Sequence, residues 1–89
     1  MEVWKFQVSP NPYVQMPKGA ELLSVGVQGQ DIMVWARVNP NATLITRRLP
    51  VYSTGHVIDP LDHELPLIGT VFIGSLVFHV FDGGEVSKE

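Results

Sequence analysis

Residues 23–38 read LSVGVQGQDIMVWARV, two runs of alternating side chains on either side of one turn. Successive residues of a strand point to opposite faces of a sheet, so this alternation indicates two half-buried strands. The apolar positions are Leu23, Val25 and Val27 in the first run, and Ile32, Val34, Ala36 and Val38 in the second. Gly29-Gln30 between them is typical of a tight hairpin with glycine at its first central position. The stretch therefore predicts an antiparallel pair of strands.

The same alternation appears at both ends of the chain. Trp4, Phe6 and Val8 share one face of an N-terminal strand, with polar residues between them. Residues 69–73 and 76–81 predict a final hairpin across a glycine turn. The second strand of that hairpin is apolar on both faces, so we expect it to be central or covered on both sides.

The middle of the chain is less regular. Residues 44–53 predict a strand, and Pro50 inside it indicates an edge or a bulge because proline cannot donate to a ladder. Residues 55–67 predict an excursion loop. The sequence predicts an all-β fold, a small single-domain antiparallel barrel or sandwich of six or seven short strands. The domain is expected over residues 1–82, with a flexible C-terminal tail over 83–89.

Composition narrows the classes of function. The chain has 89 residues, of which 45% are hydrophobic and 17% charged, a balance that excludes intrinsic disorder. It has no cysteine, which excludes disulfides and thiolate chemistry. A net charge of −3 disfavours double-stranded nucleic acid as a partner. The chain has no secretory signal and no apolar run long enough for a membrane helix, so we expect a cytoplasmic protein.

The sequence contains only weak candidates for a catalytic or metal-binding site. His56, His63 and His79 do not follow a compact metal-ligand spacing, and the acidic residues of the excursion loop are typical of a solvated loop. Thr54 stands near His56, but neighbouring residues of an extended chain point to opposite faces, which argues against a nucleophile and its base. The sequence therefore predicts a protein that is not an enzyme and has no cofactor or metal.

Arginine and aromatic residues form the candidate binding set. Guanidinium groups bind phosphates and stack on rings, and aromatic side chains anchor interfaces. Gly55 and His56 follow an edge strand at the rim of the sheet, where loops often carry function. The alternative is a solvated strand face with cross-strand ion pairs. The ligand- or partner-binding candidates are Arg47, Arg48, Arg37, Tyr52, Gly55, His56 and Trp35.

Several segments together resemble a family of small uncharacterised bacteriophage and prophage proteins. The resemblance covers most of the chain, and only the combination of segments is specific. The segments are Val3-Trp4-Lys5-Phe6, Met16-Pro17-Lys18-Gly19-Ala20, Leu23-Ser24-Val25 with Gln28, Val34-Trp35-Ala36-Arg37-Val38, Thr54-Gly55-His56, Gly69-Thr70 and Leu76-Val77-Phe78-His79-Val80-Phe81. The resemblance implies a phage gene product acting in the host cytoplasm. It supplies no catalytic residue.

Small phage proteins of this kind often counter host defence. The resemblance thus implies an accessory binding protein that covers a host antiviral factor by protein–protein occlusion. An alternative is a homo-oligomeric sponge that sequesters a small phosphorylated, nucleotide-like ligand, and a weaker one is a structural phage accessory protein. We expect a homo-oligomer in either leading case, because a small chain with few charges leaves edge strands to cover.

Overall fold

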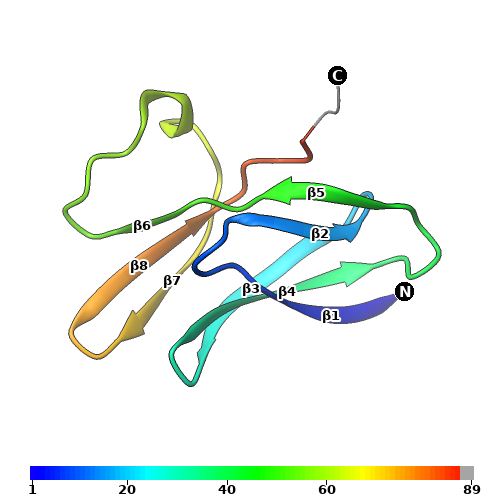
Figure 1. Ribbon diagram of the computed structural model, residues 1–89, viewed down its shortest axis with the longest axis horizontal. Coiled ribbons are helices and arrows are strands. Elements are labelled where there is room, and N and C mark those ends of the chain that lie inside the picture. The colour runs from blue at the N-terminus through cyan, green and yellow to red at the C-terminus, as the bar shows by residue number, and fades with distance from the viewer. Residues whose placement is uncertain (87–89) are drawn as a thin grey trace.

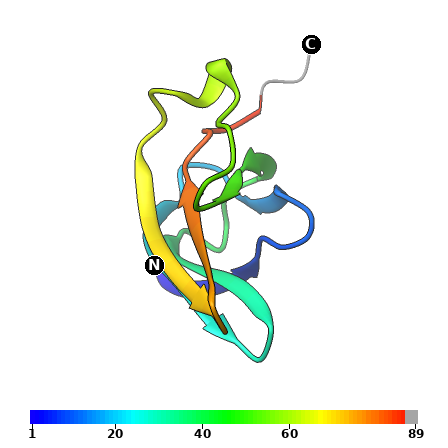
Figure 2. The same cartoon turned by 90° about the vertical axis from the view of Figure 1, so that its left-hand side faces the viewer.

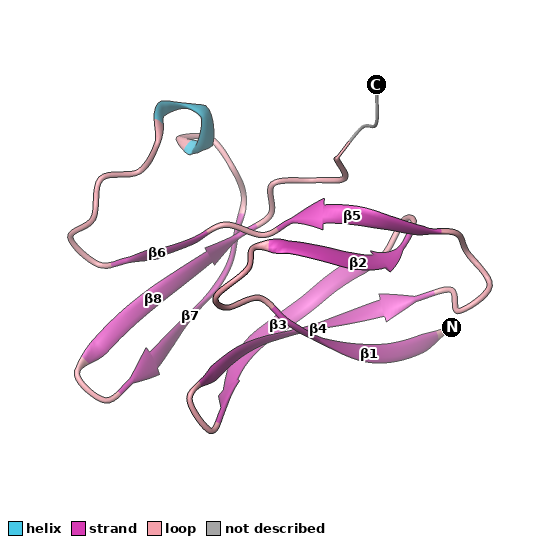
Figure 3. Ribbon diagram, viewed as in Figure 1, coloured by secondary structure: helices cyan, strands magenta, loops and turns pink. Residues whose placement is uncertain are grey.

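The computed structural model describes residues 1–86, which form eight strands and one short 3₁₀ helix (Figures 1 and 3). The elements are β1 (Glu2–Gln7), β2 (Tyr13–Pro17), β3 (Glu21–Gln28), β4 (Asp31–Val38), β5 (Leu44–Arg48), β6 (Val51–Ser53), η1 (Pro60–Asp62), β7 (Leu67–Ile73) and β8 (Leu76–Phe81). The all-β class is confirmed, with eight strands instead of six or seven. No helix within residues 1–86 has the length and apolar character of a membrane span.

The strands form three small open sheets, all antiparallel (Figure 1). Sheet A has the order β1-β4-β3, sheet B pairs β2 with β5, and sheet C has the order β6-β8-β7. The barrel expected as one possibility is not closed in the described part of the chain. One hydrophobic cluster joins the sheets, with Val34 from sheet A, Met16 from sheet B and Val80 from sheet C. The molecule is thin, with extents of 39 × 31 × 18 Å (Figure 2).

Sheet A contains the hairpin expected from residues 23–38. Gln28 pairs with Asp31 across a two-residue turn in which Gly29 has φ +64°. A two-residue turn with glycine in the left-handed region matches the twist of the flanking strands. The alternating residues of β4 are buried as predicted: Ile32, Val34, Ala36 and Val38.

A bulge in β3 changes the predicted face of one residue. The register with β4 shifts between Leu22 and Ser24, so Leu23 is the extra residue. Leu22 packs against the core, whereas Leu23 is exposed. The prediction that Leu23 shares the face of Val25 and Val27 is therefore wrong, because a bulge inverts the alternation on one side of it.

The expected strand over residues 44–53 is two strands in two sheets. β5 pairs with β2, and β6 pairs with β8. Leu49 and Pro50 separate them; the Leu49 N–H donates to the Pro12 carbonyl, and the Pro50 carbonyl accepts from the Phe81 N–H. The prediction of one continuous strand is wrong, because Pro50 has no N–H for a ladder and the chain changes sheets there.

Sheet C confirms the expectation for residues 76–81. β8 lies between β6 and β7, so its ladder groups are paired on both sides. Val71 of β7 and Val80 of β8 face the core and are buried. The hairpin turns at Gly74, which has φ +59°. The loop between β6 and β7 is the expected excursion, and it contains η1 (Figure 3).

The C-terminal segment 83–86 lies along the free edge of β5. Gly83 N–H donates to the Arg48 carbonyl, Val86 N–H donates to the Thr46 carbonyl, and Glu85 forms a bridge with Arg47. The open edge of β5 thus gives residues 83–86 backbone partners. Residues 87–89 of the expected tail lie outside the described residues.

Sheets A and C meet where β3 packs against β7. A Cβ built on Gly69 would lie 2.6 Å from Val25 Cγ2, which is closer than real Cβ atoms come to a neighbour. The close approach of the two sheets therefore requires glycine at this position.

We expect Gly69→Ala to lower the free energy of unfolding by about 1–3 kcal/mol, the usual cost of overpacking. Val25→Ala removes the methyl groups that the new Cβ would meet. The loss of unfolding free energy in the double variant should therefore be smaller than the sum of the losses in the two single variants, by about 1 kcal/mol. Urea unfolding of the four chains measures this coupling, and strict additivity would refute the contact.

Candidate functional site

The outer side of sheet C carries a row of apolar and aromatic side chains. In the register of the sheet, Phe72 is opposite Val77, and His79 lies between Thr70 and Tyr52. The neighbouring positions Val71 and Val80 face the core, so this row faces away from it. We call this surface the sheet C face; it comprises Tyr52, Leu67, Thr70, Phe72, Val77, His79 and Phe81.

Phe72 is the most exposed aromatic side chain of the sheet C face. Its exposed fraction is 68%, and Leu67 on the same strand is also exposed. Tyr52 and Phe81 lie edge to face with ring centroids 6.0 Å apart, which keeps their half-buried rings in place. A large apolar side chain held on a paired strand is the kind of group that anchors a protein interface.

His79 lies at the centre of the sheet C face and uses both ring nitrogens. Its Nε2 is 2.8 Å from Thr54 Oγ1, and its Nδ1 is 3.0 Å from Thr70 Oγ1. Sequence reasoning identified neither threonine as a partner of His79. No carboxylate among residues 1–86 bonds to the ring, so the pair Thr54–His79 lacks the acidic partner that stabilises the imidazolium in a catalytic triad.

Asp62 holds the excursion loop against sheet C. Its side chain is 2% exposed and accepts two hydrogen bonds from Arg48, at 2.8 and 2.7 Å, and one from the Tyr52 hydroxyl at 2.6 Å. The Tyr52 oxygen also accepts from the Asp59 N–H. We call Arg48, Tyr52 and Asp62 the Asp62 node. The expectation of a solvated acidic loop is wrong for Asp62, because three donors converge on its carboxylate.

The electrostatics of the node follow from these bonds. The hydrogen bonds from Arg48, and then that from Tyr52, lower the pKa of Asp62 from 3.8 to about 2. The carboxylate raises the pKa of Arg48 in turn, and its hydrogen bond raises the pKa of the Tyr52 phenol. The node is thus charged and paired at neutral pH, which fixes the loop without leaving a free charge.

The anchored loop presents two apolar side chains to solvent. Val57 is 90% exposed and Leu61 is 89% exposed. Leu61 N–H donates to the Asp59 carboxylate, which caps η1, and His63 Nε2 lies 3.0 Å from the Ile58 carbonyl oxygen. Both local bonds stabilise the loop conformation. The loop therefore adds two exposed apolar side chains beside sheet C.

The arginines proposed for phosphate binding are each bound to a carboxylate. Arg47 donates from Nε and Nη2 to Asp82 and from Nη1 to the Ala20 carbonyl. Arg48 belongs to the Asp62 node, and Arg37 pairs with Glu21 on the neighbouring strand. The alternative of cross-strand ion pairs thus describes Arg37, and the three guanidinium groups do not converge on one site.

The remaining candidates lie apart. Trp35 is half-buried on sheet A, where a Cβ on Gly26 would meet its ring at 3.1 Å. Gly55 has φ +93° in the turn after β6, and His56 beside it is exposed. Tyr52 is therefore the candidate that joins the sheet C face to the excursion loop, with Gly55 and His56 at the start of that loop. Trp35 and Arg37 belong to another sheet.

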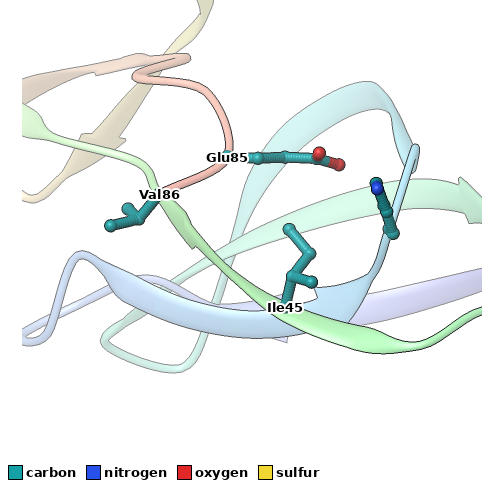
Figure 4. A pocket seen from close by; sticks show the side chains of 4 residues that line it. Ile45, Glu85 and Val86 are labelled. Carbon is teal, nitrogen blue, oxygen red and sulfur yellow. The ribbon is translucent and has the colours of Figure 1, made fainter. Parts of the chain in front are cut away.

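Two shallow hollows lie along β5, away from the sheet C face. One, of about 300 Å³, is lined by Lys18, Ile45, Glu85 and Val86 (Figure 4). The other, of about 430 Å³, shares Ile45 and Val86. The Gly19 N–H donates to the Glu85 carboxylate at 2.6 Å, so that charge is already engaged. Neither hollow gathers titratable groups into a reactive set.

One family is found in the comparisons with known proteins. The model of the family described as Domain of unknown function (DUF7352) matches residues 1–89. No curated protein and no solved structure matches the chain.

Proposed function

For this chain, which belongs to the DUF7352 family over its whole length, we propose a function in protein binding. The sheet C face and the excursion loop would cover part of a partner protein and so block its action. The observation that supports this most is the exposure of Phe72, Leu67, Val57 and Leu61 on structure fixed by strand pairing and by the Asp62 node. Large apolar side chains exposed on a fixed backbone are typical of surfaces that bind another protein.

The character of the surface supports a protein partner. Apolar anchors with polar groups around them are typical of the centre of an interface. His79 and the two threonines supply polar groups, and their mutual hydrogen bonds engage both ring nitrogens. The resemblance to small phage proteins makes the partner, in this proposal, a host antiviral defence protein met in the host cytoplasm.

The sponge for a phosphorylated ligand is the less favoured proposal. A phosphate would have to displace Asp82 from Arg47 or Asp62 from Arg48, and both pairs are bidentate. Breaking such a pair exposes a carboxylate beside the incoming phosphate, and like charges repel. Catalysis at His79 is disfavoured, since the group at its Nδ1 is the Thr70 hydroxyl and no described carboxylate bonds to the ring.

Alanine at Phe72 tests the protein-binding proposal. We expect Phe72→Ala to weaken capture of the partner from bacterial host lysate, with Kd raised at least about tenfold once the partner is purified. The matched control is Leu44→Ala, because Leu44 is also an exposed apolar residue but lies on sheet B. Equal affinity of the Phe72 variant and the unchanged chain would rule out the sheet C face as the binding surface.

A further inference from the structure

β1 forms an open edge of sheet A. It pairs with β4 on one side, and no other strand of residues 1–86 lies on its other side (Figure 1). The strand has six residues, with regular pairing from Glu2↔Val38 to Gln7↔Met33 and neither a proline nor a bulge. An edge of this kind is a template for another strand.

The other edges of the described fold each have a neighbouring segment, a proline or a short length. β3 packs against β7, and the free side of β5 is paired with residues 83–86. β2 ends in Pro17, and β6 has three residues next to Pro50. These are the usual means by which proteins close or shorten an edge. β1 has none of them.

The direction of the free backbone groups on β1 follows from one hydrogen bond. Val8 N–H donates to the Ile32 carbonyl of the hairpin partner at 3.0 Å, in register with the β1–β4 pairs. Backbone groups alternate in direction along a strand, so the even-numbered residues of β1 bond to β4. The N–H and C=O groups of Val3, Lys5 and Gln7 therefore point outward. No backbone partner for them occurs within residues 1–86.

The side chains at this edge do not protect it. A lysine on an edge strand often prevents pairing by remaining in the path of an incoming strand. Here Lys5 Nζ donates to Gln28 Oε1 at 2.7 Å and so lies over its own sheet. On the opposite face Trp4 and Phe6 pack together, with ring centroids 6.4 Å apart, and both remain half-buried.

We propose that two copies of this chain associate by antiparallel pairing of their β1 strands about a two-fold axis at Trp4. In this register Val3 of each copy forms a hydrogen-bonded pair with Lys5 of the other. Trp4 then faces Trp4 of the second copy in a non-hydrogen-bonded pair, where side chains are closest. Phe6 of each copy lies diagonal to that pair, so four rings gather over the axis and lose their remaining exposure to water.

Self-complementarity identifies the second copy as the occupant of this edge. About Trp4, the outward N–H and C=O groups of Val3 and Lys5 meet those of Lys5 and Val3 of the second copy, so the strand is its own complement. The neighbouring register about Lys5 would place the two lysines directly opposite each other, and like charges in that position are destabilising. The register about Trp4 avoids this repulsion and pairs the largest ring with itself. The proposed dimer interface lies on sheet A. An experiment can therefore refute the dimer without refuting partner binding by the sheet C face, and the reverse also holds.

Engineered cysteines test the register without competing disulfides from native cysteines, because the chain contains no cysteine. Val3→Cys and Lys5→Cys chains should form a mixed disulfide when combined and oxidised. Their Cα atoms would be about 5.5 Å apart in a hydrogen-bonded pair, within the range a disulfide spans. Each variant alone should cross-link poorly, since equal positions would be more than about 7 Å apart. Efficient cross-linking of Lys5→Cys to itself, or none in the mixture, would refute the register.

Proline at position 3 tests the pairing itself. Val3→Pro removes an outward N–H and leaves the bonds to β4, so we expect its dimer dissociation constant, measured by sedimentation velocity, to rise at least about tenfold. Val3→Thr keeps the N–H and is expected to dimerise like the unchanged chain. Circular dichroism of both variants is the control that checks whether they fold. A monomeric unchanged chain at millimolar concentration, or a proline variant that dimerises equally well, would overturn the proposal.

Discussion

Replacing Asp62 by alanine is expected to lower the free energy of unfolding by about 3 kcal/mol, since removing one partner of a buried ion pair typically costs 3–5 kcal/mol. The carboxylate is 2% exposed and accepts bonds from Arg48 and Tyr52. We place the cost at the lower end, because the Arg48 side chain is 31% exposed and water can reach it. The excursion loop should lose its anchor in this variant.

Urea unfolding followed by fluorescence measures the change at Asp62. Glu64→Ala is the matched control, since it removes another carboxylate from the same loop at an exposed position. We expect the control to stay within about 0.5 kcal/mol of the unchanged chain. Equal stability of the two variants would contradict the structural role of the Asp62 node.

The same residue predicts a dependence of stability on pH. The pKa of Asp62 is lowered from 3.8 to about 2 in the folded chain, first by the hydrogen bonds from Arg48. A lowered pKa means that the folded chain holds this proton less tightly than the unfolded chain. The stabilisation is therefore complete above the unfolded value near 4 and is lost as the pH falls towards 2. Asp62→Ala should lack this part of the acid transition, and an unchanged acid transition would contradict the assignment.

Leu49→Ala is the second large effect, an expected loss of about 3 kcal/mol. Leu49 is fully buried at the point where the chain leaves sheet B and enters sheet C. Its truncation removes apolar contact and leaves a cavity in the cluster that joins the sheets. The backbone cannot move far to fill this cavity, because Pro50 is rigid and the Leu49 N–H is bonded to the Pro12 carbonyl at 2.8 Å.

The control for this variant is Leu44→Ala, the same change at an exposed position of β5. We expect it to cost less than about 0.5 kcal/mol. Calorimetry of the two variants separates the effects, because 1 kcal/mol shifts the Tm of a domain of this size by about 4–8 °C. If Leu49→Ala had the same Tm as Leu44→Ala, the segment that passes from sheet B to sheet C at Leu49 would not be part of the core.

The local sequence pattern was sufficient to predict the hairpin over residues 23–38 and the all-β class of the fold. The period of two over residues 32–38 and the turn at Gly29 depend on near neighbours, and both are confirmed. The central place of β8 could be predicted for a similar reason, since a strand apolar on both faces must be covered on both. Leu23 was misplaced, because nothing in its immediate neighbours distinguishes a bulge from regular alternation.

The candidate site was only partly accessible to sequence reasoning. Tyr52 was named as a partner-binding residue, but its position between the sheet C face and the loop depends on Asp62, ten residues away. Arg47 and Arg48 were expected to be available to a ligand. Their carboxylate partners, Asp82 and Asp62, come from distant segments that only the folded chain brings within hydrogen-bond distance.

The amino-acid order alone was enough to establish an all-β chain, its turns and the core face of β4, because alternation and glycine conformation act between adjacent residues. The division into three sheets, the burial of Asp62 and the open edge of β1 were decided by tertiary contacts. Each of these three features depends on which segments of the chain lie side by side. Packing and hydrogen bonding between residues far apart in the sequence decide those neighbours, so a short stretch of sequence cannot predict them.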